Sequence, residues 1–293
     1  MLQNPRVSII CSCFNHEKYV IESIQSAINQ THKNIQVIVI DDFSSDNSVA
    51  IIEKFIVNYP EIIFIKNHKN LGITKSVMNA MKYVDGDFFI DLATDDVLLQ
   101  HCVEKLVNKY TNSSYNNLAL VFGNAEEISD NGKHLKYYFE VDNNLKSVQN
   151  RPTGEIYKYV INTDTIICSV STLYKKSVFD ELGGYNQNYA YEDLDYWIRA
   201  SRNYNIDYLD EIVVKKRILS SSLHSSFGKN HSFIGKSTYL IFKNASKLNQ
   251  TKEENHILSE NVFLEIKKSI KAIDFSLTFK FGFLWLLLKL RSI

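Results

Sequence analysis

Two adjacent carboxylates, Asp95 and Asp96, are the first residues of this chain whose types and spacing suggest chemistry. They follow an apolar run, Phe88–Leu92, that has the composition of a buried strand, so both acids fall on the turn that leaves it. In an open α/β sheet such turns bind ligands. A divalent cation would relieve the repulsion between the two acids and could also hold a diphosphate. The alternative is that Asp96 caps a helix expected from Val97 onward.

A second acidic pair, Asp41 and Asp42, comes at the end of another apolar run, Gln36–Ile40. A carboxylate at a strand end can accept hydrogen bonds from a nucleobase N–H or from ribose hydroxyls. The sequence has no Gly-x-Gly-x-x-Gly or Gly-x-x-x-x-Gly-Lys run, so a diphosphate would be held by a metal ion. The two pairs therefore suggest a nucleoside site and a cation site. A solvated turn over Asp41–Asp46 is the alternative.

A third acidic cluster begins with Glu192 and Asp193 and opens a predicted helix. Leu194, Trp197 and Ile198 are spaced as the inward-facing stripe of that helix, which places both acids in its first turn. Acids in a first turn are favoured by the helix dipole. The pattern fits either a capping role or a chemical one.

The elements that must position these acids alternate along the first hundred residues. Strands are predicted at Val7–Cys11, Gln36–Ile40, Ile62–Lys66 and through Ile90, and the segments between them have helical periodicity. Asn15 is expected to cap the first helix. The β-α-β-α-β-α-β series predicts a mostly parallel sheet with helices on both faces.

The composition limits the class of protein. The chain has 293 residues, of which 45% are hydrophobic, enough for one or two domains with a substantial core. Its formal net charge is zero, which argues against a nucleic-acid partner. Residues 227–293 hold eleven Lys and Arg against five Asp and Glu, or +6, and residues 1–226 hold 22 against 28, or −6. This asymmetry predicts different surroundings for the two parts.

The cysteines and the N-terminus bear on the compartment. Cys11, Cys13, Cys102 and Cys168 lie in or beside apolar runs and lack the paired spacing of zinc ligands, so buried thiols in a reducing cytoplasm are predicted. Met1–Arg6 contains no apolar segment of the secretory type. We therefore expect a cytoplasmic protein.

The last section, Phe227–Ile293, is predicted to be helical. Its apolar run Phe281–Leu288 is far shorter than the ~20 residues needed to cross a bilayer. With Trp285 and flanking Lys and Arg, residues 275–291 could form an interfacial helix on the inner face of the cell membrane. A helix packed on the rest of the chain, or a homodimer contact, would explain the same run.

Several blocks of the sequence together resemble the family-2 glycosyltransferases of the GT-A fold. The blocks are Val7–Asn15, Asn29–Thr31, Val39–Ser48, Asn70–Asn79 and Leu173–Asp193. The resemblance covers about residues 5–220. It implies a Rossmann-like GT-A catalytic domain over residues 1–226, with a nucleotide-sugar half at about 1–122 and an acceptor half at about 123–226. A helical, basic extension over 227–293 would follow.

The resemblance also implies roles for single residues. Asp41 would contact the base, Asp95 and Asp96 would bind Mn²⁺ or Mg²⁺, and Asp193 of the Glu192–Asp193 pair would be the catalytic base. The nucleotide-sugar site would consist of Cys11, Ser12, Cys13, Phe14, Asn15, Asp41, Asp42, Asn70, Gly72, Lys75, Asn79, Thr94 and Asp95.

The sequence departs from the family pattern at two places. Ala93 stands where the family often has an acid, and Leu219 and Ser220 stand where a histidine would follow Arg217. His224 or His231 could substitute from the loop that follows, but both are expected to face solvent instead. The first departure predicts weaker metal binding.

The function implied by the resemblance is inverting transfer of a sugar from a nucleoside-diphosphate sugar. A UDP-sugar is the expected donor, and a hydroxyl of a glycan or lipid-linked glycan in cell-surface polysaccharide synthesis is the expected acceptor. A metal-dependent nucleotidyltransferase is one alternative, although it needs a phosphate-gripping loop that the sequence lacks. A catalytically inactive member that binds nucleotide sugar or glycan is the other.

Overall fold

A computed structural model of the chain describes residues 4–163, 166–219 and 231–293. The chain divides into two compact units. The first comprises Met1–Gly154, Ile167–Gly184 and Asn205–Leu219, and the second comprises Glu155–Ile166, Tyr185–Tyr204 and Ser220–Ile293. Each of these units combines segments that are far apart in the sequence. The predicted division into a catalytic domain, residues 1–226, and an extension, residues 227–293, stays a prediction.

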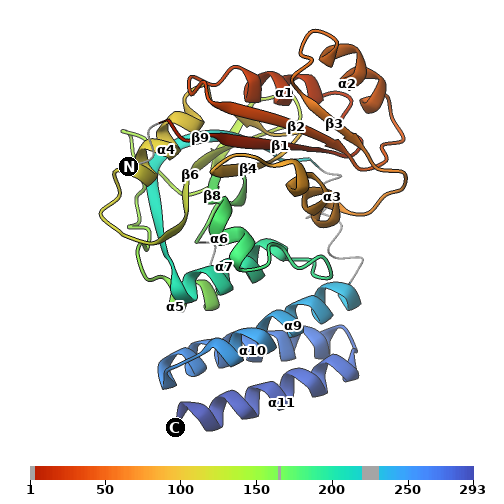
Figure 1. Ribbon diagram of the computed structural model, residues 1–293. Coiled ribbons are helices and arrows are strands. Elements are labelled where there is room, and N and C mark those ends of the chain that lie inside the picture. Colours follow the sequence, from red (N-terminus) through yellow and green to blue (C-terminus); the bar gives the residue numbers. More distant parts are fainter. Residues whose placement is uncertain (1–3, 164–165, 220–230) are drawn as a thin grey trace. The chain divides into compact units, whose positions relative to one another are not determined.

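The first unit is built on a nine-stranded sheet in the part of the chain that is described (Figure 1). Its order is β3-β2-β1-β4-β8-β6-β9-β5, with β7 paired to β6. The parallel strands are β1 (Val7–Cys13), β2 (Ile35–Asp41), β3 (Ile63–Lys66) and β4 (Phe88–Ala93). The other strands are β5 (Val97–Leu98), β6 (Leu118–Ile128), β7 (His134–Tyr137), β8 (Thr172–Lys175) and β9 (Asn205–Arg217). Among these, β6 and β9 are parallel to each other, and the remaining pairings are antiparallel.

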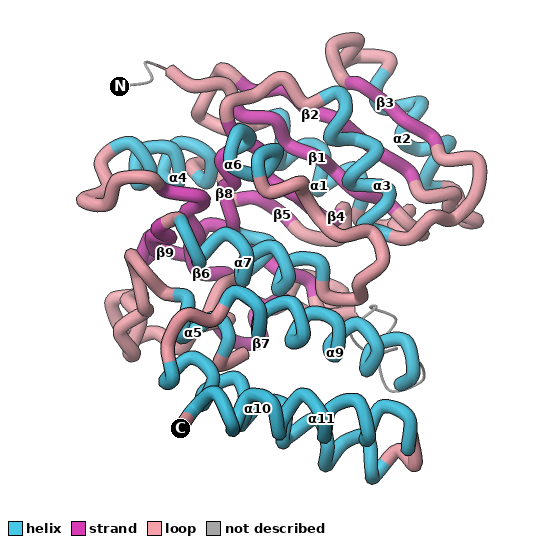
Figure 2. Tube along the Cα trace, turned by 60° about the horizontal axis from the view of Figure 1, so that its bottom comes forward, coloured by secondary structure: helices cyan, strands magenta, loops and turns pink. Residues whose placement is uncertain are grey.

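Helices cover both faces of the parallel strands, as predicted. α1 (Val20–Ile28) and α2 (Ser48–Ile56) lie on one face, and α3 (Ile73–Ala80) lies on the other (Figures 1 and 2). Right-handed crossovers explain this arrangement, because the chain steps outward from β1 to β3 and then returns past β1 to β4. α4 (Cys102–Thr111), α6 (Lys176–Glu181) and two single-turn helices, η1 (Met81–Tyr83) and η2 (Ser169–Ser171), complete the described helices of this unit.

The core of the first unit lies between the sheet and these helices. All seven residues of β1 are buried, as expected for a parallel strand covered on both faces. In β4, Phe89 stacks on Tyr174 of β8 with ring centroids 4.9 Å apart and contacts Phe179 of α6 edge to face at 4.7 Å. These rings pack β4, the last of the parallel strands from β1 to β4, against its antiparallel neighbour β8 and against α6.

Two local predictions were wrong. The helix expected from Val97 begins at Cys102, because Val97 and Leu98 instead pair with Lys215 and Val214 of β9. Asn15 does not cap the first helix. That helix begins at Val20, and Asn15 lies in the preceding turn with a φ of +57°.

The described part of the second unit is helical. It consists of α5 (Tyr157–Ile161), α7 (Glu192–Asn203), α9 (His231–Leu248), α10 (Lys252–Lys271) and α11 (Phe275–Ser292). Thr251 and Glu254 form a reciprocal capping box that starts α10. α10 and α11 run side by side (Figure 2), and Leu277, Phe281, Leu284 and Leu288 form the buried stripe of α11. The predicted C-terminal helices are therefore confirmed.

None of the described helices is both long enough and apolar enough to span a bilayer.

Candidate functional site

The carboxyl ends of three parallel strands bring the predicted residues of the first unit together. Cys13 of β1 is paired with Asp41 of β2, and Ser12 of β1 is paired with Ala93 of β4. The turns that follow these strands therefore lie at one edge of the sheet, where α/β folds bind ligands. Asp41, Thr94 and Asp95 all belong to this edge.

Asp41 is a buried carboxylate held by its own turn. It is 1% exposed, and its two oxygens accept hydrogen bonds from the backbone N–H of Ser44 at 2.9 Å and from the Ser44 hydroxyl at 2.5 Å. The neighbouring turn is tied to it, because the Asn15 N–H donates to Ser44 Oγ at 2.9 Å and Asn15 Oδ1 accepts from the Ser45 N–H at 2.8 Å. Asp41 is therefore not solvated, whereas Phe43 and Ser45 of the same turn are exposed.

Two aromatic side chains project from these joined turns. Phe14 is 43% exposed and Phe43 is 56% exposed. Phe43 has a φ of +64°, an unusual conformation for a residue with a β-carbon. The exposed rings give this edge of the sheet an apolar surface beside the Asp41 carboxylate.

Asp42 organises the loop before α3. Its Oδ1 accepts from Asn67 Nδ2 at 2.9 Å and from the Leu71 N–H at 2.8 Å, and its Oδ2 accepts from the Gly72 N–H at 2.8 Å. Gly72 adopts a φ of +85°, which glycine tolerates without strain. The contacts of Asp42 are therefore those of a positioning residue, and its predicted contact with a nucleotide stays a prediction.

The remaining predicted residues of this loop and of α3 lie around the same carboxylate. Asn70 Oδ1 also accepts from the Gly72 N–H at 3.1 Å, and Asn79 Nδ2 donates to Asn67 Oδ1 at 3.3 Å. Lys75 is exposed. Asn70 and Gly72 are thus connected to Asn79 through Asp42 and Asn67 in one hydrogen-bonded group.

The side chains of Cys11, Ser12 and Cys13 are buried, at 0%, 3% and 2% exposure. Burial raises the pKa of both thiols, so they stay protonated at neutral pH. These buried side chains end β1, directly before the turn that contains Phe14 and Asn15. The expectation that all four cysteines are buried thiols is confirmed.

A histidine that the sequence analysis did not single out faces Asp95. Nε2 of His16 lies 4.0 Å from Asp95 Oδ2, and Nδ1 lies 2.9 Å from Thr94 Oγ1. The backbone N–H of His16 donates to Ser48 Oγ at 3.0 Å, which fixes the turn that carries the imidazole ring. The only sequence signal for this residue is its place directly after the Phe14–Asn15 turn.

Asp96 does not cap a helix, because α4 begins six residues later and its N-cap is His101. It is 3% exposed, and its Oδ1 accepts from the backbone N–H of Arg217 at 2.7 Å. Burial, and then the neighbouring charge of Asp95, raise the pKa of the Asp96 carboxyl well above its ordinary value. This acid therefore joins the turn to β9, and its predicted metal contact stays a prediction.

Arg217 is the second residue of this site that the sequence analysis did not assign. Its guanidinium donates to the backbone carbonyl of Asp95 at 3.0 Å, to that of Asp130 at 2.8 Å and to Glu22 Oε2 at 2.8 Å. The same group lies 4.7 Å from the centre of the Tyr19 ring. Arg217 is only 6% exposed, so it is a buried hub that fixes the position of the Asp95 turn.

The side chains at this turn fit a divalent cation that the substrate phosphates also hold better than one that the protein binds alone. Among the described residues, no group of three or more His, Cys, Asp or Glu side chains is placed to hold a metal ion. Asp95 and His16 supply one oxygen and one nitrogen. Mg²⁺ is typically bound by one or two carboxylates together with substrate phosphates and water, which matches the single Asp95 carboxylate, whereas the His16 nitrogen is a ligand more typical of transition metals.

The third acidic cluster lies in the second unit, in the first turn of α7 as predicted. The N-cap is Tyr191, whose side chain makes no capping hydrogen bond. Asp193 Oδ1 accepts from the N–H of the next residue, Leu194, at 2.7 Å. A local backbone contact of Asp193 is therefore present, although Asp193 is not the N-cap.

The predicted inward stripe of α7 was partly wrong. Ile198 is buried, but Leu194 and Trp197 are only partly buried, and Asp195 and Tyr196 take the inward positions. Asp195 pairs with Arg199 one turn later, with Nη2 of Arg199 at 2.8 Å from Oδ2. Burial raises the pKa of Asp195, and the Arg199 charge opposes that rise.

Two tyrosines of the preceding loop are packed inside the second unit. Tyr185 meets Tyr196 edge to face at 6.0 Å, and Tyr189 accepts a hydrogen bond from Asn244 at 3.0 Å. They are 5% and 8% exposed. The predicted histidine substitutes are not tested, because His224 and the side chain of His231 lie outside the described residues.

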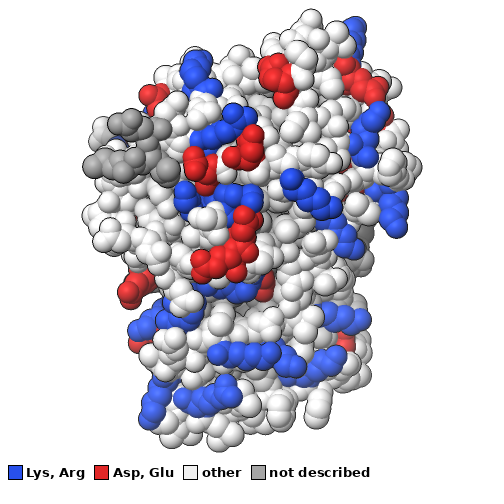
Figure 3. Space-filling view, viewed as in Figure 1, with Lys and Arg blue, Asp and Glu red and all other residues white. Residues whose placement is uncertain are grey.

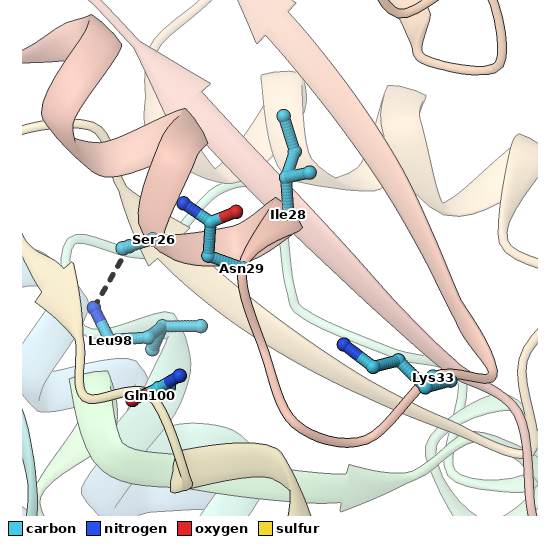
Figure 4. Close-up of a pocket in the computed structure, with 6 residues that line it drawn as sticks. All are labelled: Ser26, Ile28, Asn29, Lys33, Leu98 and Gln100. Carbon is cyan, nitrogen blue, oxygen red and sulfur yellow. Dashed lines mark hydrogen bonds between the residues drawn. The ribbon is translucent and has the colours of Figure 1, made fainter.

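The first unit also contains a pocket away from these strand ends. It is lined by Ser26, Ile28, Asn29, Lys33, Leu98 and Gln100 (Figure 4). The Leu98 N–H donates to Ser26 Oγ at 3.1 Å across it. The pocket lies by the end of α1 and the loop that leads into β2, and it contains none of the predicted site residues. The strand-end cluster is therefore the stronger candidate.

Comparison with known families and proteins gives the following findings. The family described as Glycosyl transferase family 2 matches residues 8–183. An uncharacterised glycosyltransferase of Methanocaldococcus jannaschii is 30% identical over 220 residues, which cover 74% of this chain and 72% of that protein. Several other relatives are longer, and the match spans 31% to 35% of their length.

Solved structures agree on the fold. Residues 1–349 of S. aureus TarS, in complex with UDP-GlcNAc, match 87% of this chain and 71% of that chain with a TM-score of 0.67 and 18% identity. The mannosyltransferase PcManGT of Pyrobaculum calidifontis, in complex with GDP-Man and Mn²⁺, matches 99% of this chain and 88% of that chain with a TM-score of 0.59 and 11% identity. The predicted GT-A architecture is confirmed.

Proposed function

Because the chain belongs to glycosyl transferase family 2, we propose that it moves a sugar from a UDP-sugar to a hydroxyl of a glycan or lipid-linked glycan. The proposed setting is cell-surface polysaccharide synthesis on the cytoplasmic side of the membrane. The observation that carries the proposal is the convergence of Asp41, His16 and Asp95 at the carboxyl edge of the parallel strands. A nucleoside-diphosphate sugar has matching parts, namely a base, a diphosphate and a sugar.

The nucleoside would bind at the joined turns after β1 and β2. Asp41 would accept a hydrogen bond from a base N–H, for which its carboxylate is already desolvated and oriented by Ser44. The exposed rings of Phe14 and Phe43 would supply an apolar face for the base. Asp42 would act indirectly, by holding the loop before α3 in place.

The diphosphate would bind at the Thr94–Asp95 turn together with Mn²⁺ or Mg²⁺. Asp95 and His16 would hold the ion, and Arg217 would fix the Asp95 backbone so that the carboxylate keeps its direction. When bound, the cation would neutralise charge on the departing diphosphate. The Mn²⁺ in the PcManGT complex supports this assignment.

The transfer itself would be a single displacement. Asp193 would take the proton from the acceptor hydroxyl while that oxygen forms a bond to the anomeric carbon and the bond from this carbon to the diphosphate breaks. General-base assistance of this kind contributes ~10²–10⁴-fold to the rate. One direct displacement inverts the anomeric configuration. Glu192, the neighbouring acid, would belong to the same catalytic site.

The test is to incubate the full chain with Mn²⁺ and a panel of nucleotide sugars, with and without EDTA, and to measure the released nucleotide. Metal-dependent release of a nucleoside diphosphate is the expected result. A parallel incubation with nucleoside triphosphates and sugar phosphates tests the alternative, because release of pyrophosphate there, with no nucleoside diphosphate released from the nucleotide sugars, would instead indicate a nucleotidyltransferase. Binding without turnover for every donor and acceptor tried would indicate an inactive member of the family, for which Ala93 is the motivating observation.

A further inference from the structure

The last helix, α11, carries two apolar stripes. One is buried and packs within the second unit, as described above. The other consists of Phe275, Phe279, Phe283, Leu286 and Leu290, which are 76%, 78%, 65%, 55% and 74% exposed. Because these residues are spaced by three or four positions, they lie along one side of the helix. We call them the outer stripe.

The outer stripe is too apolar to be explained as scattered surface residues. Single exposed apolar side chains are normal, but a continuous row of them marks an interaction surface. Ile270 at the end of α10 and Ile273 in the turn before α11 are also exposed, at 57% and 74%. They come directly before Phe275 in the chain and extend the apolar surface past the start of α11.

Positive charge accompanies this surface. Residues 267–293 contain six Lys and Arg, and Asp274 is their only acid; Lys268 and Lys289 are paired with Glu265 and Glu260 of α10, and the other four form no ion pair among the described residues. The Asp274 side chain is occupied, because it accepts from the Leu277 N–H at 2.9 Å as the N-cap of α11. Figure 3 shows basic side chains spread over these C-terminal helices, with few acidic ones between them. A helix with apolar residues on its outer side and basic residues beside them is typical of a helix that lies on an anionic lipid surface.

We propose that the outer stripe docks onto an anionic lipid bilayer, with α11 lying flat in the interface. A second copy of the chain fits this surface less well, because a symmetric contact would bring the unpaired Lys267, Lys271 and Lys280 of one copy toward those of the other. An anionic bilayer supplies both the apolar interior for Phe279 and Phe283 and the negative charge for the basic residues. No described helix could span the bilayer, so the contact would be peripheral.

The structure also decides which residues make the contact. Trp285 was the expected interface anchor, but its ring packs on Phe263 of α10 with centroids 5.9 Å apart and lies 5.9 Å from Lys289 Nζ. The three phenylalanines of the outer stripe are the anchors instead. This surface belongs to the second unit and does not depend on the proposed donor chemistry.

The experiment is sedimentation of the full chain with vesicles of phosphatidylcholine alone and with vesicles that also contain phosphatidylglycerol. Wild type should bind the anionic vesicles, bind the neutral ones at least several-fold more weakly, and lose affinity in 0.5 M NaCl, where charges are screened within a few ångströms. The double variant Phe279→Ser, Phe283→Ser should bind about tenfold more weakly or worse, because it lacks two rings that would be buried in the bilayer.

The matched control is Val57→Ser with Leu135→Ser, which removes two exposed apolar side chains from the first unit. It should sediment as wild type does. The proposal would be overturned by a wild type that does not sediment, by a Phe279/Phe283 variant that sediments normally, or by a wild-type dimer that this variant dissociates in analytical ultracentrifugation. UDP binding, measured on the same preparations, should be unchanged, so a failure of lipid docking is separable from a failure of the proposed sugar transfer.

Discussion

Asp95 is the side chain on which the proposed diphosphate site depends most. Its carboxylate faces His16, while its backbone carbonyl is held by Arg217. Asp95→Ala should remove most of the Mn²⁺-dependent affinity for UDP, because the ion loses its carboxylate ligand. His16→Ala should weaken the same affinity by a smaller factor, about tenfold, because one neutral ligand is lost. Calorimetry with UDP, with and without Mn²⁺, measures both.

A matched control for these variants is Asp85→Ala. Asp85 pairs with Arg6 in the segment that leads into β4, at the opposite end of the strand from Asp95. It removes one carboxylate from the same unit without touching the proposed site. If Asp95→Ala bound UDP and Mn²⁺ as tightly as Asp85→Ala does, the metal assignment would be wrong.

Asp195 gives a prediction about pH. Its pKa is raised because burial disfavours the charged form more than Arg199 favours it. A carboxyl with a raised pKa binds a proton more readily in the folded state, so the free energy of unfolding falls as pH rises from its ordinary pKa through the folded one. Asp195→Asn removes this loss while keeping an acceptor oxygen for Arg199.

The measurement is the melting temperature of wild type and of Asp195→Asn between pH 4 and pH 7. The melting temperature of the variant minus that of wild type should increase as the pH rises across this range. A difference that stayed constant, or that decreased toward pH 7, would mean that the Arg199 pair outweighs the burial of Asp195.

At the scale of elements, Arg217 connects β9 to the turn after β4, to the turn after β6 and to α1. Arg217→Ala would leave the carbonyls of Asp95 and Asp130 without this donor inside the protein. We expect a loss of about 3 kcal/mol in the free energy of unfolding, because buried polar groups are costly when unpaired. UDP affinity should fall as well, since the Asp95 turn loses its support.

Urea unfolding of Arg217→Ala and of Arg6→Ala tests this prediction. Arg6 also forms an ion pair, but with an exposed partner, and such surface pairs contribute about 0–1 kcal/mol. Arg217→Lys should not restore stability, because one ammonium group cannot reproduce the fan of guanidinium contacts. Equal losses for Arg217→Ala and Arg6→Ala would show that Arg217 is not a structural hub.

At the scale of the whole molecule, the proposed roles are divided between the two compact units. The nucleotide and metal residues belong to the first unit, and Asp193 belongs to the second. Asp193→Asn should therefore leave UDP affinity and the melting temperature nearly unchanged while transfer falls by ~10²-fold or more, because the amide cannot accept the proton. Transfer rate, UDP affinity and melting temperature should be measured on one preparation.

A control for this variant is Asp180→Asn, which alters an exposed acid of the first unit in α6. It should turn over normally. If Asp193→Asn also turned over normally, Asp193 would not be the base, and Glu192 would be the next candidate. An Asn can accept the same backbone hydrogen bond, so folding alone should not change.

The sequence by itself determined the parallel half of the sheet and the three acidic clusters. Apolar runs such as Phe88–Leu92 and helical periodicity are local properties, and they are readable without knowing what packs against them. The blocks from Val7 to Asp193 also sufficed to identify the family and the fold. The predicted strands at Val7, Gln36, Ile62 and Ile90 are all present.

Tertiary structure alone decided the features that depend on distant partners. Val97 and Leu98 form a strand only because β9, more than one hundred residues later, supplies the hydrogen bonds. For the same reason, no local pattern could place Arg217 against Asp96. The sequence of α11 could not reveal which side of the helix is covered, because apolar residues occur on all of its sides and their periodicity distinguishes none of them. Burial by other elements decided that Phe281 is inside and Phe279 outside.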